Sequence, residues 1–419
     1  MRIFPRPLFG YLALLVLFVL VVYRGVFPAF TQIDTDFPNY YTAARIVLEQ
    51  GDVNRLYDDQ WFQEQISAHR IQAKGKFSPF PPTTALLATP LGLVQPQTAL
   101  RLLTLVNLIC VSICVILLAQ ATSFEFPDVA VFVLLAGVGL INCIRFGQWY
   151  IVVALSIIAG YVLYQHGRFI LSGICFGLFV PVKYFPILFV LYFAARKEWR
   201  LVVSAIATSM LLILVSLLVL GWEIHYAFLT SVLGDHLQSR YTLQSPFTGT
   251  FQSFDSLLHQ LMVYDPEQNP RPAVLSADML PDVKWGIVTF LVLVALVSIF
   301  RSQRLGASAS VSLSLSLLSV LGLLIAPGGA TYHFVLLWLP CALLLQWLDN
   351  TGRNRLFLLT LLIYGAIGFI PYSLFHSFEG RGWLSVLAFP RLCLMILLFF
   401  VAVVTMWLPA TRQPLARNV

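Results

Sequence analysis

Long runs of apolar residues recur along this chain and limit what it can fold into. Residues 8–23 contain no charged side chain, and comparable runs return as far as residue 408. A helix needs about 20 apolar residues to cross the hydrocarbon core of a bilayer. Only 11% of the residues are charged, whereas a soluble domain carries about a quarter, so too few charges exist to cover a water-facing surface. We therefore expect lipid to be the main solvent.

The apolar runs divide into about twelve segments. They cover residues 8–30, 97–121, 128–144, 149–166, 168–184, 185–196, 200–220, 285–300, 307–326, 332–348, 356–372 and 385–408. Residues 308–318 alternate serine and leucine as a strand would, but a lone strand in lipid would leave its backbone groups unpaired, so this segment should also be helical. The sequence predicts an all-α polytopic membrane protein that forms a single transmembrane domain over residues 1–419.

Basic residues mark the turns that are expected to face the cytoplasm. They are Arg196, Lys197 and Arg200, Arg301 and Arg304, Arg353 and Arg355, with Arg2, Arg6, Arg412 and Arg417 near the termini. Two long loops, residues 31–77 and 221–284, carry fourteen of the nineteen acidic residues. We expect both termini inside and both loops outside, with interfacial helices over residues 38–50 and 57–72.

The first outer loop opens with Asp34-Thr35-Asp36-Phe37-Pro38-Asn39-Tyr40-Tyr41. A carboxylate at the edge of the lipid is partly desolvated, which raises its pKa and makes it a better base. The plain alternative is that Asp34 or Asp36 caps the helix that begins near Pro38. Both interpretations stay open from the sequence.

Four further outer motifs contain polar or aromatic side chains at the expected membrane boundary. They supply Phe80 before two prolines, Arg145 and Gln148 around Gly147, Lys183 and Tyr184 between Pro181 and Pro186, and Tyr332 and His333 after a Gly-Gly turn. Arg145 either anchors to lipid phosphate or holds one particular ligand. Lys183 either snorkels to water or binds an anion, and His333 is either a hydrogen-bonded structural histidine or a ligand contact.

These motifs share the outer side of the predicted membrane. A carboxylate base facing several cations suits the transfer of a group from a phosphate leaving group to a hydroxyl. The carboxylate would take the hydroxyl proton while the cations stabilise the departing phosphate. Asp36 is the candidate base, and Arg145, Lys183 and His333 are the candidate cations.

The order of the motifs resembles glycosyltransferase family 87 of the GT-C superfamily. The series is Asp-Phe-x-x-Tyr-Tyr-x-Ala-Ala, then Phe-Pro-Pro with Pro-Leu, then Gly-Gln-Trp, then Lys-Tyr-Phe-Pro, from Asp36 to about His333. The resemblance implies a GT-C-like fold in a bacterial inner membrane and a periplasmic active site. It implies inverting transfer of a mannose- or arabinofuranose-like sugar from a polyprenyl-phosphate donor to a glycolipid or glycan acceptor.

The resemblance also implies roles for particular residues. Asp36 would be the general base. Lys183, Arg145, His333, Gln148, Tyr184 and Tyr332 would contact the donor phosphate or sugar, and Asp34, Tyr40, Tyr41 and Phe80 would be acceptor or secondary contacts. The family more often has tyrosine at the position of Phe80, so this chain lacks a hydroxyl there.

Asp34 and Asp36 also form an Asp-x-Asp pair, a metal-binding pattern in some GT-C enzymes. The resemblance implies that single-sugar transferases of this superfamily that use polyprenyl phosphates generally work without a metal, so we expect no cofactor. The six cysteines show no metal-ligand spacing. A transporter or lipid flippase and an oligosaccharide polymerase or ligase are the alternatives, although no internal repeat is visible.

Overall fold

The computed structural model describes residues 7–237, 245–274 and 276–409. Its regular elements within these residues are all helices, and an isolated bridge joins Asp265 and Asn269. The chain divides into two compact units, the first formed mainly by residues 1–238 and the second mainly by residues 239–419. Short pieces at residues 122–124 and 135–138 belong to the second unit. The all-α fold predicted from the sequence is confirmed, and the single domain stays a prediction.

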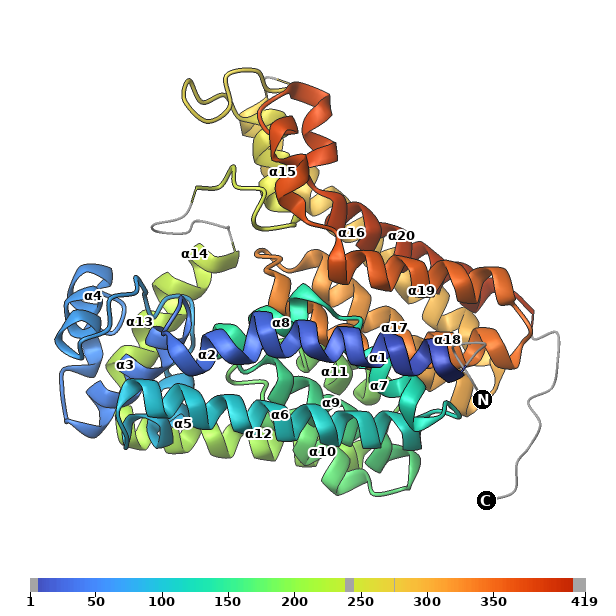
Figure 1. Cartoon of the computed structure of the whole chain (residues 1–419), viewed down its shortest axis with the longest axis horizontal. Helices are drawn as coiled ribbons and strands as arrows, with labels where there is room; N and C mark the ends of the chain where they lie inside the picture. Colours follow the sequence, from blue (N-terminus) through green and yellow to red (C-terminus); the bar gives the residue numbers. More distant parts are fainter. Residues whose placement is uncertain (1–6, 238–244, 275, 410–419) are drawn as a thin grey trace. The chain divides into compact units, whose positions relative to one another are not determined.

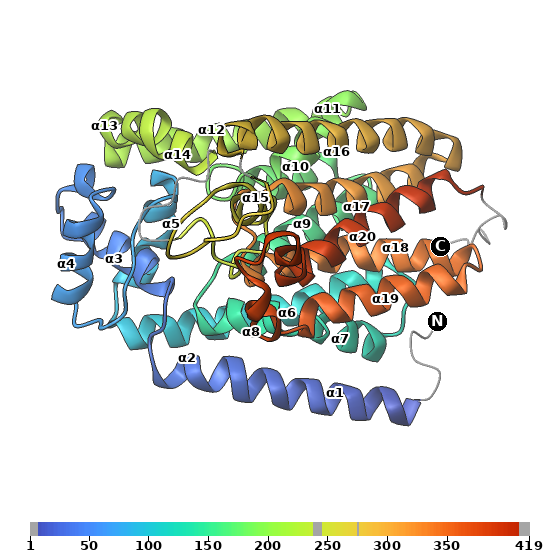
Figure 2. The same ribbon diagram turned by 90° about the horizontal axis from the view of Figure 1, so that it is seen from above.

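The first unit contains fourteen α-helices (Figure 1). They are α1 (Pro7–Val21), α2 (Phe27–Thr31), α3 (Phe37–Leu48), α4 (Asp59–Ala68), α5 (Pro82–Gly92), α6 (Pro96–Ala121), α7 (Phe126–Leu134), α8 (Val138–Arg145), α9 (Tyr150–Gln165), α10 (Phe169–Leu178), α11 (Ile187–Ala195), α12 (Trp199–Leu220), α13 (Trp222–Ala227) and α14 (Leu233–Leu237). The axes of the long helices α1, α6 and α12 are roughly aligned in both views, and α6 runs antiparallel to α1 and α12 (Figure 1, Figure 2). Helix α9 packs against α6 and α10, and α10 packs against α12.

The second unit is built around α17 (Ala307–Ile325), which packs against α16 (Leu280–Ser302), α18 (Trp338–Asn350) and α20 (Pro390–Trp407). Helix α19 (Asn354–Phe369) packs against α18 and α20, while α15 (Phe254–Met262) lies against α16. Short 3₁₀ segments, η6 (Thr331–Leu337), η7 (Tyr372–Phe378) and η8 (Gly382–Ala388), connect or extend these helices. Twelve of the nineteen residues of α17 are buried, so this helix forms the centre of the unit.

Seven helical segments of the described chain are long and apolar enough to cross a membrane, or up to nine if each of two bent pairs is one span. The bent pairs are α7 with α8 and α19 with η7. Three of the twelve predicted segments correspond to the shorter helices α9, α10 and α11. Every predicted segment is therefore mainly helical. The twelve predicted segments exceed the seven long spans because two segments are bent and three are short. The protein is a multi-pass membrane protein.

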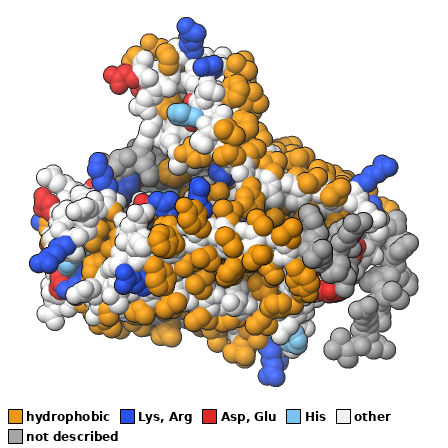
Figure 3. Space-filling view, viewed as in Figure 1, with side chains coloured by type: hydrophobic (Ala, Val, Ile, Leu, Met, Phe, Trp, Pro, Cys, Tyr) orange, Lys and Arg blue, Asp and Glu red, His pale blue; other side chains and the backbone are white. Residues whose placement is uncertain are grey.

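Exposed apolar side chains lie along the long helices, as expected for surfaces in contact with lipid. On α12, Val203, Met210 and Leu218 are 62%, 59% and 77% exposed. Figure 3 shows hydrophobic side chains over much of the face in view. Large exposed apolar areas of this kind are rare on soluble monomers, which supports membrane insertion of these helices.

Helices α3 and α4 form where the sequence predicts interfacial helices, but α3 is more buried than such a helix would be. Nine of its twelve residues are buried. Pro38 stands near its start, where a missing N–H costs nothing. One face of α3 packs on α5 through Tyr40, Ala44 and Ala88. This packing holds the Asp36 end of α3 inside the first unit.

Candidate active site

Asp36 occupies the N-cap position of α3, but its side chain does not cap the helix. Its backbone has φ +70° and ψ −48°, and no helix N–H donates to its carboxylate. The Phe37 N–H donates to the Thr35 carbonyl oxygen at 2.9 Å across Asp36, which closes a strained γ-turn. Such a backbone costs on the order of 1–3 kcal/mol. The capping interpretation of Asp36 is wrong, and the turn directs its carboxylate elsewhere.

The carboxylate of Asp36 meets Gln148, which follows a glycine turn at the end of α8. Gly147 has φ +61°, and a Cβ there would lie 2.9 Å from Phe37 Cδ2 and 3.0 Å from Leu100 Cδ1. Only glycine fits this position, which gives the Gly-Gln-Trp motif a physical reason. The Gln148 side chain is fully buried, and Asn107 Nδ2 donates to its backbone oxygen at 3.3 Å.

One chain of hydrogen bonds joins four side chains, in the order Lys183, Tyr40, Gln148 and Asp36. Lys183 Nζ donates to Tyr40 Oη at 3.3 Å, and Tyr40 Oη donates to Gln148 Oε1 at 2.7 Å. Gln148 Nε2 donates to Asp36 Oδ2 at 2.8 Å. Burial raises the pKa of Tyr40, so its phenol stays protonated and keeps its donor role. Every bond therefore points from the ammonium toward the carboxylate, and the two charges are coupled without touching.

Lys183 lies in the turn between α10 and α11 and is only 8% exposed. Its Nζ lies 4.3 Å from the centroid of the Phe80 ring and 4.7 Å from that of Tyr150. Burial lowers the pKa of Lys183 to about 7, although the Asp36 carboxylate opposes this shift. A snorkelling lysine would extend its ammonium into water, so the snorkelling interpretation is wrong. The ammonium is instead held among aromatic rings.

Phe80 is held in place by the long loop of residues 31–77. Tyr57 Oη donates to the Phe80 carbonyl oxygen at 2.7 Å, and the Tyr40 and Phe80 ring centroids lie 5.0 Å apart. Phe80 therefore lies between the loop and the ammonium of Lys183. The Phe-Pro-Pro motif therefore contributes a ring to the site.

Arg145 and Asp34 form an ion pair beside this chain of hydrogen bonds. Arg145 Nη2 lies 2.6 Å and Nε 2.8 Å from the same oxygen, Oδ2 of Asp34. The positive charge of the guanidinium is thus partly neutralised by Asp34. Asp34 and Asp36 point to different partners, and within the described residues no group of three or more His, Cys, Asp or Glu side chains could hold a metal ion. The donor contact expected of Arg145 and the absence of a metal both stay predictions.

Two further candidate tyrosines, Tyr41 and Tyr184, make none of the hydrogen bonds of this chain. Tyr41 faces another side of α3 and donates to the Val94 carbonyl oxygen at 2.9 Å. Tyr184 is 36% exposed, in contrast to the neighbouring Lys183, and burial of part of its ring raises its pKa. Their predicted contacts with acceptor and donor stay predictions.

Tyr332 and His333 belong to the second unit. Both stand in η6, and their ring centroids lie 5.0 Å apart with an edge-on orientation. The preceding turn is tied down by Gln252, whose backbone N–H donates to the Gly329 oxygen at 3.2 Å. Their roles as donor contacts stay predictions.

Arg391 is a buried cation that the sequence analysis missed. It is 2% exposed at the start of α20, and its Nε donates to the Ile367 oxygen at 3.0 Å. The Gln252 side chain accepts from its backbone N–H at 2.9 Å, so it is joined to the turn before Tyr332. Its Nη1 is buried and has no hydrogen-bond partner among the described residues. An arginine with a spare buried donor is a candidate anion ligand.

The helices and this arrangement of charges define a polytopic membrane protein with a buried polar site. The sequence model of Glycosyltransferase family 87 matches residues 79–327, more than half of the chain. The chain therefore belongs to glycosyltransferase family 87, which makes it a membrane glycosyltransferase. None of the curated proteins matches the sequence significantly.

The family match divides the candidate residues. The matched segment includes Phe80, Arg145, Gln148, Lys183 and Tyr184. The residues outside it are Asp34, Asp36, Tyr40 and Tyr41 before the segment, and Tyr332, His333 and Arg391 after it. The hydrogen-bonded chain thus joins two residues inside the matched segment to two that precede it.

Proposed function

We propose that this glycosyltransferase moves a single mannose- or arabinofuranose-like sugar from a polyprenyl-phosphate donor to a hydroxyl of a glycolipid or glycan acceptor, with inversion at the anomeric carbon. The observation that carries the proposal is the hydrogen-bonded chain from Lys183 through Tyr40 and Gln148 to Asp36. It supplies a carboxylate for a proton and a buried cation for a phosphate within one rigid arrangement.

In the proposed reaction the acceptor oxygen attacks the anomeric carbon from the face opposite the phosphate. A carbon–oxygen bond to the acceptor forms, and the bond between the anomeric carbon and the phosphate oxygen breaks. The electron pair leaves with polyprenyl phosphate, and Asp36 takes the acceptor proton. Lys183 compensates the charge that develops on the leaving phosphate, since a buried cation acts more strongly than one in water.

Gln148 and Tyr40 position the two charged groups in this mechanism. The Gln148 amide fixes one oxygen of Asp36 and leaves the carboxylate anionic, because an amide N–H stabilises the charged form. Tyr40 keeps the ammonium of Lys183 from collapsing onto the carboxylate. The acceptor hydroxyl can therefore contact the Asp36 carboxylate, while the donor phosphate contacts the Lys183 ammonium at a separate point.

The proposed site opens to the periplasmic side, with both termini in the cytoplasm. The acidic outer loops and basic short loops of the sequence support this orientation. Nucleotide sugars are absent on that side, which favours a lipid-linked donor. Asp34 is already paired with Arg145, and this supports a reaction without a metal.

The test compares donors with the purified protein in lipid nanodiscs. We expect transfer from a polyprenyl-phosphate sugar and no transfer from the corresponding nucleotide sugar. Mass spectrometry of the product identifies the linkage, and NMR of the new anomeric centre reports inversion. Equal or faster transfer from the nucleotide sugar would overturn the proposal.

A further inference from the structure

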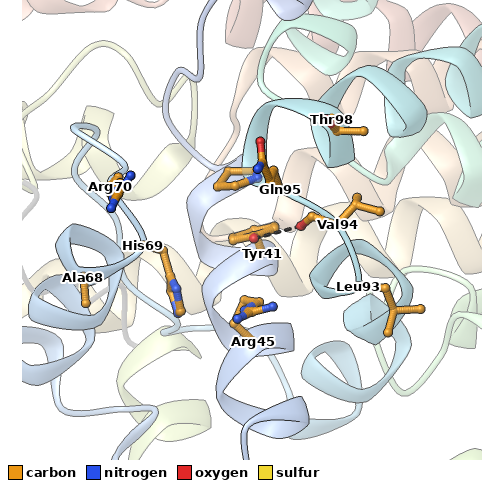
Figure 4. A pocket seen from close by; sticks show the side chains of 10 residues that line it. Tyr41, Arg45, Ala68, His69, Arg70, Leu93, Val94, Gln95 and Thr98 are labelled. Atoms are coloured by element: carbon orange, nitrogen blue, oxygen red, sulfur yellow. Dashed lines mark hydrogen bonds between the residues drawn. The ribbon is translucent and has the colours of Figure 1, made fainter.

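A polar cavity lies on another side of α3 from the hydrogen-bonded chain. Its volume is about 610 Å³, and its polar lining comes from Tyr41, Arg45, His69, Arg70, Gln95 and Thr98. Figure 4 shows Tyr41 and Arg45 on α3, with His69 and Arg70 on one side and residues 93–98 on the other. The whole cavity is formed by the first unit.

Two hydrogen bonds fix the wall of this cavity. Tyr41 Oη donates to the Val94 oxygen at 2.9 Å, and Arg45 Nη1 donates to the Gly92 oxygen at 3.0 Å. Both bonds connect α3 to the turn that leads into α6. The ring of His69 stands edge-on to Tyr41 with centroids 6.0 Å apart. The lining side chains are thus held in place before any ligand arrives.

The wall retains unused hydrogen-bonding capacity. Arg45 Nε and His69 Nε2 are both buried and have no hydrogen-bond partner among the described residues. Arg45 also pairs with Glu49, while Arg70 adds a second, exposed guanidinium at the end of α4. Burial lowers the pKa of His69, with Glu49 opposing and Arg45 favouring the shift, so its ring is neutral near pH 7 and can donate one N–H. These groups together favour an anion with several acceptor oxygens, as a phosphate has.

Apolar surface adjoins this cationic wall. Leu93 is 71% exposed at the rim, and Val94 and Pro96 also line the cavity. Pro96 begins α6, a candidate membrane span of 26 residues. The end of a span lies at headgroup depth, where a lipid presents its phosphate next to its acyl chains. The cavity therefore combines a phosphate-binding wall with a rim suited to a lipid tail.

We propose that this cavity binds the phosphate of an anionic lipid headgroup. The site is separate from the proposed transfer site, and its occupation does not depend on the proposed function. Two guanidiniums and one imidazole bind the phosphate oxygens, while Leu93 and Pro96 contact the tail. Binding at Tyr41 and Arg45 would stabilise α3, the helix that also carries Asp36 and Tyr40.

The test measures lipid binding by native mass spectrometry of the delipidated full-length protein. Phosphatidylglycerol and phosphatidylcholine are titrated separately onto the parent, Arg70→Gln, and the double variant Arg45→Gln/Arg70→Gln. A basic residue near the membrane surface contributes to anionic-lipid binding by about five-fold, so we expect roughly five-fold weaker phosphatidylglycerol binding for Arg70→Gln and about twenty-five-fold for the double variant. Arg70 is exposed, and its replacement leaves the Tyr41 and Arg45 bonds to the wall intact.

Arg55→Gln is the matched control, because Arg55 is an exposed arginine of the same loop that does not line the cavity. It should bind phosphatidylglycerol as the parent does. Equal binding by Arg70→Gln and the parent, or no preference of the parent for phosphatidylglycerol over phosphatidylcholine, overturns the proposal. Binding of inorganic phosphate as tight as that of phosphatidylglycerol overturns the lipid as the source of the phosphoryl group.

Discussion

Two lysines whose side chains are largely buried, one in each unit, are held in different ways. Lys284 of the second unit forms an ion pair with Asp255 at 2.6 Å, and their side chains are 11% and 6% exposed. Lys183 of the first unit has no carboxylate within ion-pair distance among the described residues and contacts a phenol and aromatic rings instead. A buried charge is costly unless a partner compensates it. Lys284 therefore has its counter-charge within the protein, whereas Lys183 keeps its ammonium available for an anion.

The difference separates a structural charge from a functional one. Removing one partner of a closed pair leaves the other charge buried and alone, which destabilises the fold. Removing Lys183 relieves a desolvated charge and leaves no protein charge without an ion-pair partner, although Tyr40 loses one hydrogen bond and a ligand would lose its cation. Activity and thermal stability therefore report separately on the two lysines.

Asp36→Asn should abolish most of the transfer rate. The substitution keeps the shape of the side chain, but an amide cannot take the acceptor proton. A general base typically contributes about 10²–10⁴-fold in rate, so the transfer rate should fall by roughly that factor while donor binding persists. Single-turnover transfer and donor binding, measured on the same sample, check this.

Asp34→Asn is the control for Asp36→Asn, because Asp34 pairs with Arg145 and has no role as a base. Its loss in rate should be much smaller. Near-parental transfer by Asp36→Asn would remove this residue from the mechanism. Equal losses at both positions that also depend on a chelator would instead indicate that the aspartates bind a metal together.

Lys183→Met and Lys284→Met should have opposite consequences. Methionine keeps most of the apolar stem in both cases. A hydrogen bond to a charged group is worth about 1.5–3 kcal/mol, so Lys183→Met should weaken donor binding roughly 10–100-fold and leave thermal stability unchanged. Lys284→Met leaves Asp255 buried without its ion-pair partner, at a cost of about 3–5 kcal/mol in stability. Thermal unfolding and donor titration of both variants test the comparison.

Unchanged donor binding by Lys183→Met would give that lysine a structural role. Unchanged stability of Lys284→Met would remove the contrast between the two units. The double variant Asp255→Leu/Lys284→Met is a further control, because it removes both charges and should recover much of the lost stability.

Donor affinity should fall as the pH rises through about 7. The pKa of Lys183 is lowered to about 7 by burial, so the ammonium is present below this pH and is lost above it. The phosphodiester of the donor does not titrate in this range. Affinity should therefore decrease by up to roughly ten-fold per pH unit above the midpoint, until it reaches the level of Lys183→Met. Lys183→Arg, whose side chain stays charged, should show a flat profile, and a flat profile for the parent would contradict the assignment.

Much of the fold followed from the sequence because lipid imposes a simple rule on the backbone. Every apolar run had to be a helix, and each of the twelve predicted segments is mainly helical. The bend between α7 and α8, at 73°, was not predicted, because the run 128–144 is mostly apolar. Gly137, which has φ +53° and lies between the two helices, was the available signal. The burial of α3 was missed for a similar reason, since its aromatic residues fit either an interface or a core.

Most residues of the site could be predicted from the sequence, but the hydrogen bonds that join them could not. Asp36, Gln148 and Lys183 stood out by motif and position, yet their sequence does not reveal that Tyr40 joins them. Helical geometry alone does not indicate which face of α3 points at Gln148. Arg391 was missed because it lies at the start of an apolar run and resembles an interfacial anchor in the sequence. The only earlier signal was its position directly after Pro390, where a helix begins.

Phe80 offers the finest test of how Lys183 keeps its charge without an ion pair. Its ring centroid lies 4.3 Å from Nζ, and a cation over an aromatic ring gains about 0.5–2 kcal/mol. Phe80→Leu removes this contribution, so the pKa of Lys183 should fall by roughly 0.4–1.5 units. The midpoint of the pH profile for donor binding should move down by the same amount, with a loss in affinity of a few-fold at pH 7. Phe80→Tyr keeps the ring, so its midpoint should stay with that of the parent. If Phe80→Leu retains the parental midpoint, the ring does not stabilise the ammonium, and Tyr40, Tyr150 and Asp36 must account for a charged Lys183.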